Sequence, residues 1–196
     1  MTRFLRTSLL AVTLTSALAT SLTARAADVA GVHFDDKTSL AGSELALNGA
    51  GLRTRFMLKV YVIGLYGPKR ADTADAFSAM PGPKRIHIVT LRDLTAEQFA
   101  DALIDGLRKN SSDAEFAKLQ PRADEFRAQL LALKSTPSGS QIRIEWLPAT
   151  GTRLSLGNEI RGRDIPGEDF FRALLRIWLG DKPVDSDLRN ALLGKG

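Results

Sequence analysis

The run FMLKVYVIGLY, from Phe56 to Tyr66, limits the possible folds more than any other part of the chain. A strand exposes successive side chains on opposite faces of its sheet, and this run is apolar at both sets of alternating positions. Val60 and Val62 lie on one face, and Tyr61 and Ile63 on the other. The pattern therefore predicts a strand that is covered on both sides.

Arg53 stands just before this run, in the segment NGAGLR. Glycine permits positive φ, so residues 48–51 are predicted to form a turn. A guanidinium between a turn and a buried strand needs an anion to offset its desolvation. Either an Asp or Glu of the same chain or the anionic group of a bound ligand can supply this anion.

Other strands and helices are indicated by periodicity and by capping residues. Thr-x-x-Gln at Thr95 and Ser-x-x-Glu at Ser112 are capping boxes, and each predicts the start of a helix. Pro121 either kinks the second of these helices or opens a new helix that ends near Leu133. Predicted strands cover 29–34, 84–91 and 141–146, with a hairpin at 152–156 and 159–163; further helices cover 168–179 and 185–193. This order predicts a single α+β domain over residues 27–196, with a largely antiparallel sheet and helices packed on one face.

Residues 1–26 have the pattern of a secretory signal peptide. Arg3 and Arg6 precede an apolar stretch, and Ala24-Arg25-Ala26 is a small-x-small cleavage signal. The whole sequence carries a net charge of +5; without this segment, 24 Lys and Arg face 22 Asp and Glu, a net charge of about +2. We therefore expect a periplasmic protein that begins at Ala27.

Composition excludes several classes of function. The chain has no cysteine, so thiol catalysis and Cys-ligated metals are excluded, and His33 and His87 are too isolated to predict a metal site. No cofactor-binding motif occurs, and the scattered charges with few aromatic residues do not predict nucleic-acid binding. After residue 26, no apolar stretch approaches the roughly 18 residues of a membrane span.

Four segments resemble the chalcone isomerase superfamily, specifically its bacterial exported, chalcone isomerase-like branch. NGAGLR is similar to that family's Gly-Ala-Gly-Val-Arg segment, and LKVYVIGLY to its Lys-Phe-Thr-Ala-Ile-Gly-Val-Tyr strand. LTAEQFADAL resembles the helix that follows, and LLRIWLGDKPVDSDLRNALLG the C-terminal helices. The resemblance spans nearly all of residues 27–196. It implies an open-faced β-sandwich with a ligand cleft between the sheet and its helices.

The resemblance also implies that the catalytic residues are missing. Plant chalcone isomerases add a phenolate to an enone with help from an arginine and from Thr, Tyr and Asn side chains that stabilise the enolate. Only the arginine is kept, as Arg53. The family Thr falls at Tyr61, its Tyr at Phe99, its Asn at Gly106, and the Thr of its late helix at or beside Ile177. We expect no catalytic residue.

A binding function fits the same substitutions. In the superfamily's non-catalytic fatty-acid-binding members, an arginine and a tyrosine hold the carboxylate, and Arg53 with Tyr61 resembles that pair. Phe99, Gly106 and Ile177 would then line the cleft. The chain is accordingly expected to bind a small amphipathic carboxylate, such as a fatty acid, without a cofactor. Eight residues of straight strand would place Arg53 and Tyr61 about 26 Å apart, so the pair forms only if the chain bends between them.

Alternatives follow from these residues. Without a bend, Arg55 or Lys59 becomes the anion partner. An isomerase acting on a flavonoid-like or other enone would need other hydroxyls, such as those of Tyr66 or Thr90, in the vacated positions. A partner-binding subunit of an envelope complex would show an exposed apolar patch around Trp178.

Overall fold

The computed structural model describes residues 26–195, so the predicted signal peptide lies almost wholly outside the described residues. The strands are β1 (Ala27–Val29), β2 (Val32–Phe34), β3 (Lys37–Leu40), β4 (Ser43–Arg55), β5 (Leu58–Gly67), β6 (Lys84–Thr90), β7 (Leu94–Thr95), β8 (Ser135–Thr136), β9 (Gln141–Leu147), β10 (Gly151–Leu156) and β11 (Glu159–Ile165). The helices are α1 (Ala74–Ala79), α2 (Ala96–Lys109), α3 (Asp113–Leu131), α4 (Glu168–Leu179) and α5 (Ser186–Leu192).

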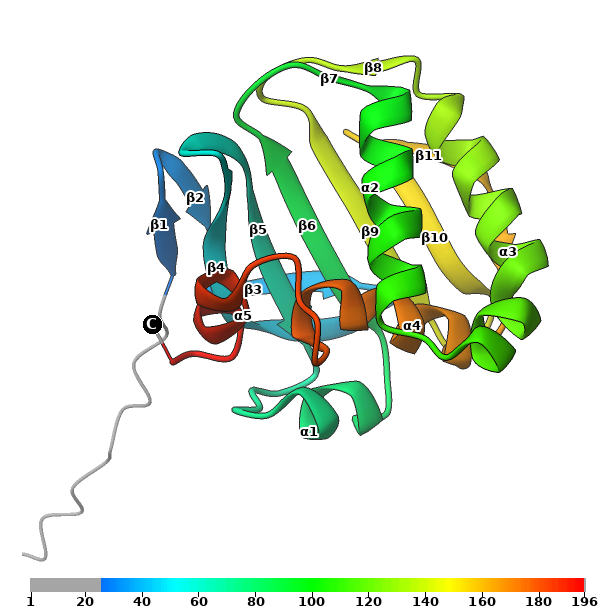
Figure 1. The fold of residues 1–196 in the computed structure, drawn as a ribbon. Coiled ribbons are helices and arrows are strands. Elements are labelled where there is room, and N and C mark those ends of the chain that lie inside the picture. The colour runs from blue at the N-terminus through cyan, green and yellow to red at the C-terminus, as the bar shows by residue number, and fades with distance from the viewer. Residues whose placement is uncertain (1–25, 196) are drawn as a thin grey trace, which may run out of the picture.

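Seven strands form one antiparallel sheet in the order β11-β10-β9-β6-β5-β4-β3. Helices α2, α3 and α4 lie over one face of this sheet, and α5 packs against β4 (Figure 1). The short β1–β2 hairpin lies beside β4 (Figure 1). This arrangement confirms the predicted α+β class with helices on one face.

Strand β5 is buried on both faces, as its sequence predicts. Ile63 and Leu65 belong to the main core beneath the helices. Val62 and Tyr66 point to the other side, where they join a smaller core that includes Phe34 from the β1–β2 hairpin. Strand β5 therefore holds the two cores together.

The predicted turn at residues 48–51 is wrong, because these residues lie inside β4. The β4–β5 register shifts between Leu47 and Gly49, which marks a bulge at Asn48. The Asn48 amide nitrogen donates to the carbonyl oxygen of Leu192 at 2.7 Å. The polar residue thus joins a bulged strand to the end of α5.

The glycines of this segment serve close packing and not positive φ. A Cβ at Gly49 would lie 2.2 Å from the carbonyl oxygen of Ala191, and one at Gly51 would lie 2.7 Å from Leu188 Cδ1. Both distances are too short for any side chain. Glycine at these positions allows α5 to rest directly on β4.

The chain reverses instead at Phe56 and Met57, where φ is 48° and 63°. The strand predicted to start at Phe56 therefore starts at Leu58. Two consecutive positive φ angles are typical of a tight two-residue hairpin turn, which usually takes Asn or Gly. Because the two turn residues are bulky and apolar, the sequence pattern predicts strand at this turn.

The helix predictions hold with small changes. The capping box at Thr95 is present in full, and Ser112 accepts a hydrogen bond from the backbone of Glu115. Helix α3 continues through Pro121 to Leu131 without a break. The predicted strand 29–34 is in fact the two strands β1 and β2, which pair with each other.

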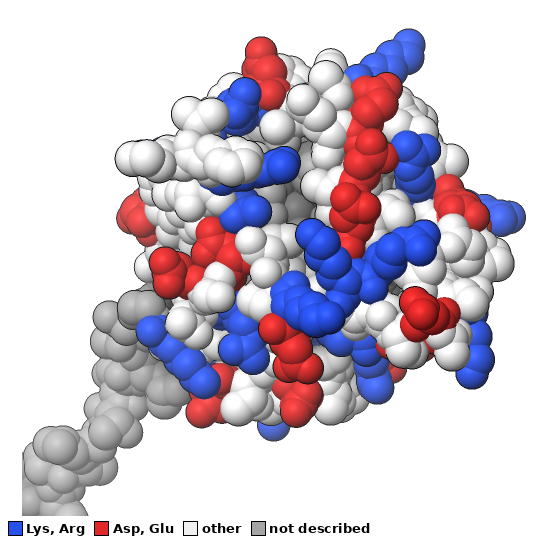
Figure 2. All heavy atoms as spheres, in the orientation of Figure 1, with Lys and Arg blue, Asp and Glu red and all other residues white. Residues whose placement is uncertain are grey.

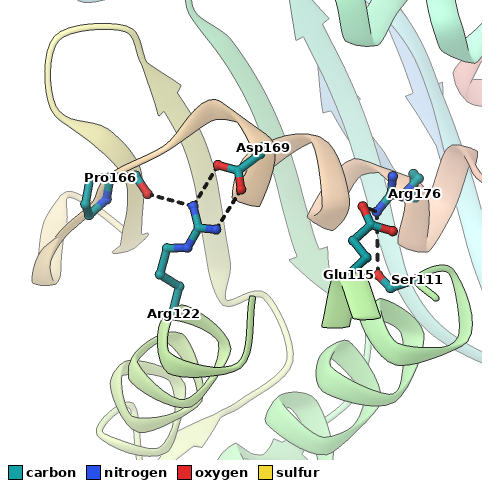
Figure 3. A network of polar contacts seen from close by, with 6 residues as sticks. All are labelled: Ser111, Glu115, Arg122, Pro166, Asp169 and Arg176. Atoms are coloured by element: carbon teal, nitrogen blue, oxygen red, sulfur yellow. Dashed lines mark hydrogen bonds and ion pairs between the residues drawn. The ribbon is translucent and has the colours of Figure 1, made fainter. Parts of the chain in front are cut away.

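Two ion pairs between side chains fasten α3 to α4 (Figure 3). Arg122 binds both carboxylate oxygens of Asp169, at 2.7 and 2.6 Å. Arg176 donates to Glu115 at 2.5 Å. Because α4 also packs on α2, these contacts help to fix the helical layer over the sheet.

We predict that Gly49→Ala lowers the free energy of unfolding by on the order of 1–3 kcal/mol, because the new methyl group must displace the backbone of α5. Urea titration followed by circular dichroism measures the change. Thr54→Ala, at an exposed position in the same strand, is the matched control and should stay within about 0.5 kcal/mol of the wild type. Equal midpoints for the two variants would contradict this packing role.

Candidate functional site

A cleft of about 540 Å³ opens between the β4–β5 hairpin and helix α2. Most of its wall is apolar, with charged side chains around the rim. The lining residues are Arg53, Arg55, Phe56, Leu58, Val60, Tyr61, Arg92, Leu94, Gln98, Phe99, Asp101, Ala102, Leu103, Asp105, Ile177 and Val184.

The hairpin brings the two predicted ligand-binding residues together. Arg53 on β4 is the cross-strand partner of Tyr61 on β5. Directly opposed residues in an antiparallel pair have Cα atoms about 4.5–5.5 Å apart and side chains on the same face. The tight turn at Phe56 and Met57 supplies the bend that the separation along the chain requires, and a register shift between Arg53 and Thr54 sets Tyr61 opposite Arg53.

Arg53 also has a partner within the chain. Its Nη1 atom donates to Asp185 Oδ2 at 3.3 Å and to the carbonyl oxygen of Thr54, and the Arg53 and Asp185 side chains are both mostly buried. The other Asp185 oxygen caps α5 by accepting from the backbone N–H groups of Asp187 and Leu188. Asp185 is therefore the acid of the same chain that pairs with Arg53.

The Arg53 guanidinium keeps further donor capacity. Among residues 26–195 its Nε and Nη2 atoms make no hydrogen bond, so only one edge of the group is used. A guanidinium carries five N–H donors in a planar fork that suits carboxylates. The internal ion pair and an external anion can therefore share one arginine.

Tyr61 is held by the C-terminal part of the chain. Its hydroxyl oxygen accepts a hydrogen bond of 2.9 Å from the indole N–H of Trp178 on α4. Burial is the main reason that the pKa of Tyr61 rises to about 12, and the Trp178 hydrogen bond and the charge of Arg53 offset only part of this rise. Near neutral pH the hydroxyl is protonated and able to donate.

The three residues expected to line the cleft fall into two groups. Phe99 and Ile177 are buried and form part of its apolar wall. Gly106 lies outside the lining, where a Cβ would come within 2.8 Å of Ile177 Cγ2. The missing side chain at Gly106 allows α2 and α4 to approach each other.

The rim of the cleft is basic on one side and acidic on the other. Arg55 and Arg92 lie on the rim, and Lys59 is exposed nearby on the hairpin. Asp101 and Asp105 stand on the α2 side. Figure 2 shows a hollow between the acidic row over α2 and the basic side chains opposite.

The residues that an isomerase or a partner-binding subunit would use lie outside this cleft. The Tyr66 hydroxyl donates to the carbonyl oxygen of Asp35, and the Thr90 hydroxyl donates to that of Pro137. Neither residue lines the cleft. Trp178 is 2% exposed, so it belongs to the core and forms no surface patch.

A second depression of about 600 Å³ lies among α1, α2, α4 and the C-terminal segment. Its walls carry many charged side chains, and two of its arginines are already paired: Arg176 with Glu115 and Arg172 with Glu168. It has no apolar wall like that of the first cleft. We therefore take the cleft beside Arg53 as the functional site.

Within residues 26–195, no group of three or more His, Asp or Glu side chains is placed to hold a metal ion. In the same range, none of the helices is long and apolar enough to span a membrane.

Comparison with known proteins gives a family match and a likeness to solved structures. A family model described as chalcone isomerase-like matches residues 26–194. A search of curated protein sequences finds no match. The fold is similar to that of the crystal structure of an Arabidopsis thaliana fatty-acid binding protein, with a TM-score of 0.62 and 19% sequence identity. The likeness covers 83% of this chain and 92% of that chain.

The burial of both tyrosines predicts a pH dependence. The chain has only Tyr61 and Tyr66, and burial raises the pKa of each to about 12. An unfolded tyrosine ionises near pH 10, so the stabilisation from neutral, buried tyrosines is complete below pH 10 and is lost as pH rises towards 12. Tyrosinate absorbance should stay low up to about pH 11 while the fold persists. Ionisation of either tyrosine near pH 10 in the folded protein would contradict this assignment.

Proposed function

Because the chain belongs to the chalcone isomerase-like family, we propose that its cleft binds a small amphipathic carboxylate, such as a fatty acid, without catalysing a reaction on it. The observation that carries the proposal is the cross-strand placement of Arg53 and Tyr61 in a cleft whose other walls are mostly apolar. The fatty-acid binding protein from Arabidopsis thaliana, which shares the fold, supports the same ligand class.

The chemistry of the two polar residues suits a carboxylate. The unused edge of the Arg53 guanidinium offers charge-assisted hydrogen bonds. Tyr61 accepts from Trp178, which leaves its own O–H free to donate to a second oxygen. In this arrangement a ligand carboxylate shares Arg53 with Asp185, while the other Asp185 oxygen keeps its hydrogen bonds to α5.

The apolar wall suits an aliphatic chain. Phe99, Leu103 and Ile177 present no hydrogen-bonding side chain to the cleft. Its volume of about 540 Å³ falls within the usual range for small-molecule sites, roughly 300–1,000 Å³. Each methylene removed from water contributes about 0.8 kcal/mol, so chain length should govern affinity and Arg53 should govern headgroup choice.

The same geometry disfavours an isomerase. Phe99 stands where the resemblance places a tyrosine, and Ile177 at or beside the position of a threonine. Neither side chain offers a donor to a developing enolate. The alternative hydroxyls of Tyr66 and Thr90 bond to backbone carbonyls outside the cleft. The buried position of Trp178 likewise gives no support to a docking patch on the C-terminal helices.

The proposal predicts a preference for acids over alcohols that depends on Arg53. A fatty acid and the fatty alcohol of equal length bury the same chain, so their affinity ratio isolates the headgroup. We expect the purified, delipidated protein to prefer the acid by about 10-fold or more, because a hydrogen bond to a charged group contributes about 1.5–3 kcal/mol. Isothermal titration calorimetry measures both affinities.

Arg53→Gln should reduce this ratio to about one while leaving affinity for the alcohol nearly unchanged. Arg172→Gln removes an equal charge at an ion-paired site outside the cleft and serves as the control that should keep the preference. The proposal fails if the wild type does not distinguish acid from alcohol, or if Arg53→Gln still prefers the acid.

We also propose that the protein acts in the periplasm after removal of residues 1–26, as their signal-peptide pattern suggests. The intact mass of the protein from a periplasmic extract should correspond to a chain that begins at Ala27. A soluble cytoplasmic protein that keeps residues 1–26 would contradict export.

A further inference from the structure

The tip of the β4–β5 hairpin is apolar and exposed. Phe56, Met57 and Leu58 have 85%, 98% and 54% of their surface exposed. Among residues 26–195 only one other large hydrophobic residue, Ile160, is comparably exposed. A soluble domain gains nothing in stability from such a cluster in water, so the tip calls for another explanation.

The backbone conformation of the turn also disfavours large side chains. Phe56 and Met57 both have positive φ, a conformation that bulky side chains adopt only with strain. Asn-Gly would satisfy the same turn without strain. The chain therefore places two large apolar side chains where folding alone would favour small or polar ones.

Basic side chains flank the tip. Arg55 and Lys59 immediately precede and follow it, and neither forms an ion pair with any residue from 26 to 195. The Arg55 guanidinium lies 5.4 Å from the centre of the Phe56 ring. Where Figure 1 draws this turn, Figure 2 shows protruding uncharged side chains with basic side chains beside them.

An apolar tip with unpaired cations at its base matches the chemistry of an anionic bilayer surface. Aromatic and aliphatic side chains enter the boundary between headgroups and acyl chains, while Lys and Arg stay at the level of the anionic headgroups. The acidic side chains Asp101 and Asp105 line the opposite, α2 side of the cleft. An anionic bilayer repels these carboxylates, which keeps the α2 side of the cleft away from the surface. The hairpin tip therefore contacts the bilayer first.

We propose that the Phe56–Leu58 tip docks this protein on an anionic lipid bilayer. Arg55, Phe56 and Leu58 also line the cleft that contains Arg53 and Tyr61. Docking through the tip therefore turns one wall of the cleft towards the membrane. Docking itself is independent of the proposed ligand; only the passage of a lipid from bilayer to cleft rests on the proposed function.

Vesicle flotation with ligand-free protein tests the proposal. The vesicles contain phosphatidylcholine with or without phosphatidylglycerol. The wild type should float with the anionic vesicles, and Phe56→Asn/Met57→Gly should reduce its partition by about 10-fold or more through loss of apolar insertion. Arg55→Gln/Lys59→Gln should reduce binding to anionic vesicles by a similar factor.

The tip variant is designed so that unfolding cannot explain the loss. Asn-Gly relieves the strain of the turn, so the thermal midpoint should equal or exceed that of the wild type. Ile160→Ser, at the other exposed site, is the matched control and should bind vesicles as the wild type does.

Three results would overturn the proposal: no wild-type binding to anionic vesicles, undiminished binding by the tip variant, or wild-type self-association in sedimentation that the tip variant abolishes without any vesicle binding. The last result would identify the tip as a contact between copies of the protein.

Discussion

The pairing register of β4 with β5 is the constraint on which the site depends. The two-residue turn at Phe56 and Met57 starts this register, and a shift between Arg53 and Thr54 then sets Tyr61 opposite Arg53. The bulge at Asn48 adjusts the register again farther along the pair. A shift of one residue would turn Tyr61 to the opposite face of the sheet, away from Trp178. Burial of β5 on both faces opposes such a shift, since every side chain of the strand would then enter the wrong core.

The polar groups of the cleft are organised by the C-terminal part of the chain. Asp185 and Trp178 hold Arg53 and Tyr61 through one ion pair and one hydrogen bond. Such partners fix the orientation of both side chains before any ligand arrives, which reduces the entropy lost on binding. They also explain how a guanidinium can be mostly buried within the fold. An internal partner and a ligand-binding role are therefore compatible.

Sequence patterns predict the parts of this structure that depend on local chemistry. The two-sided burial of β5, the capping box at Thr95 and the last helix after Asp185 all follow from residues that are neighbours in the chain. Local sequence patterns do not predict the structure of residues 48–51. Its glycines avoid contact with α5, and nothing near them in sequence indicates that helix.

The site was only partly predictable for the same reason. Arg53 stands out as a cation beside a buried strand and Tyr61 follows from the family resemblance, but their approach depends on a turn that lacks the usual turn residues. Trp178 lies 117 residues from Tyr61, and an apolar helix position carries no sign of such a hydrogen bond. Gly106 illustrates the reverse case, since a family position in the cleft has become a point of contact between helices.

The central claim is that Arg53 serves an anion from outside the chain in addition to Asp185. Native mass spectrometry of the protein purified from its own cell envelope tests this claim most directly, with Arg53→Gln alongside. The account predicts that the wild type carries a lipid with a carboxylate headgroup and that the folded variant is empty. A wild-type protein that is empty, or that carries a neutral molecule also retained by the variant, would show that Arg53 serves only its internal ion pair.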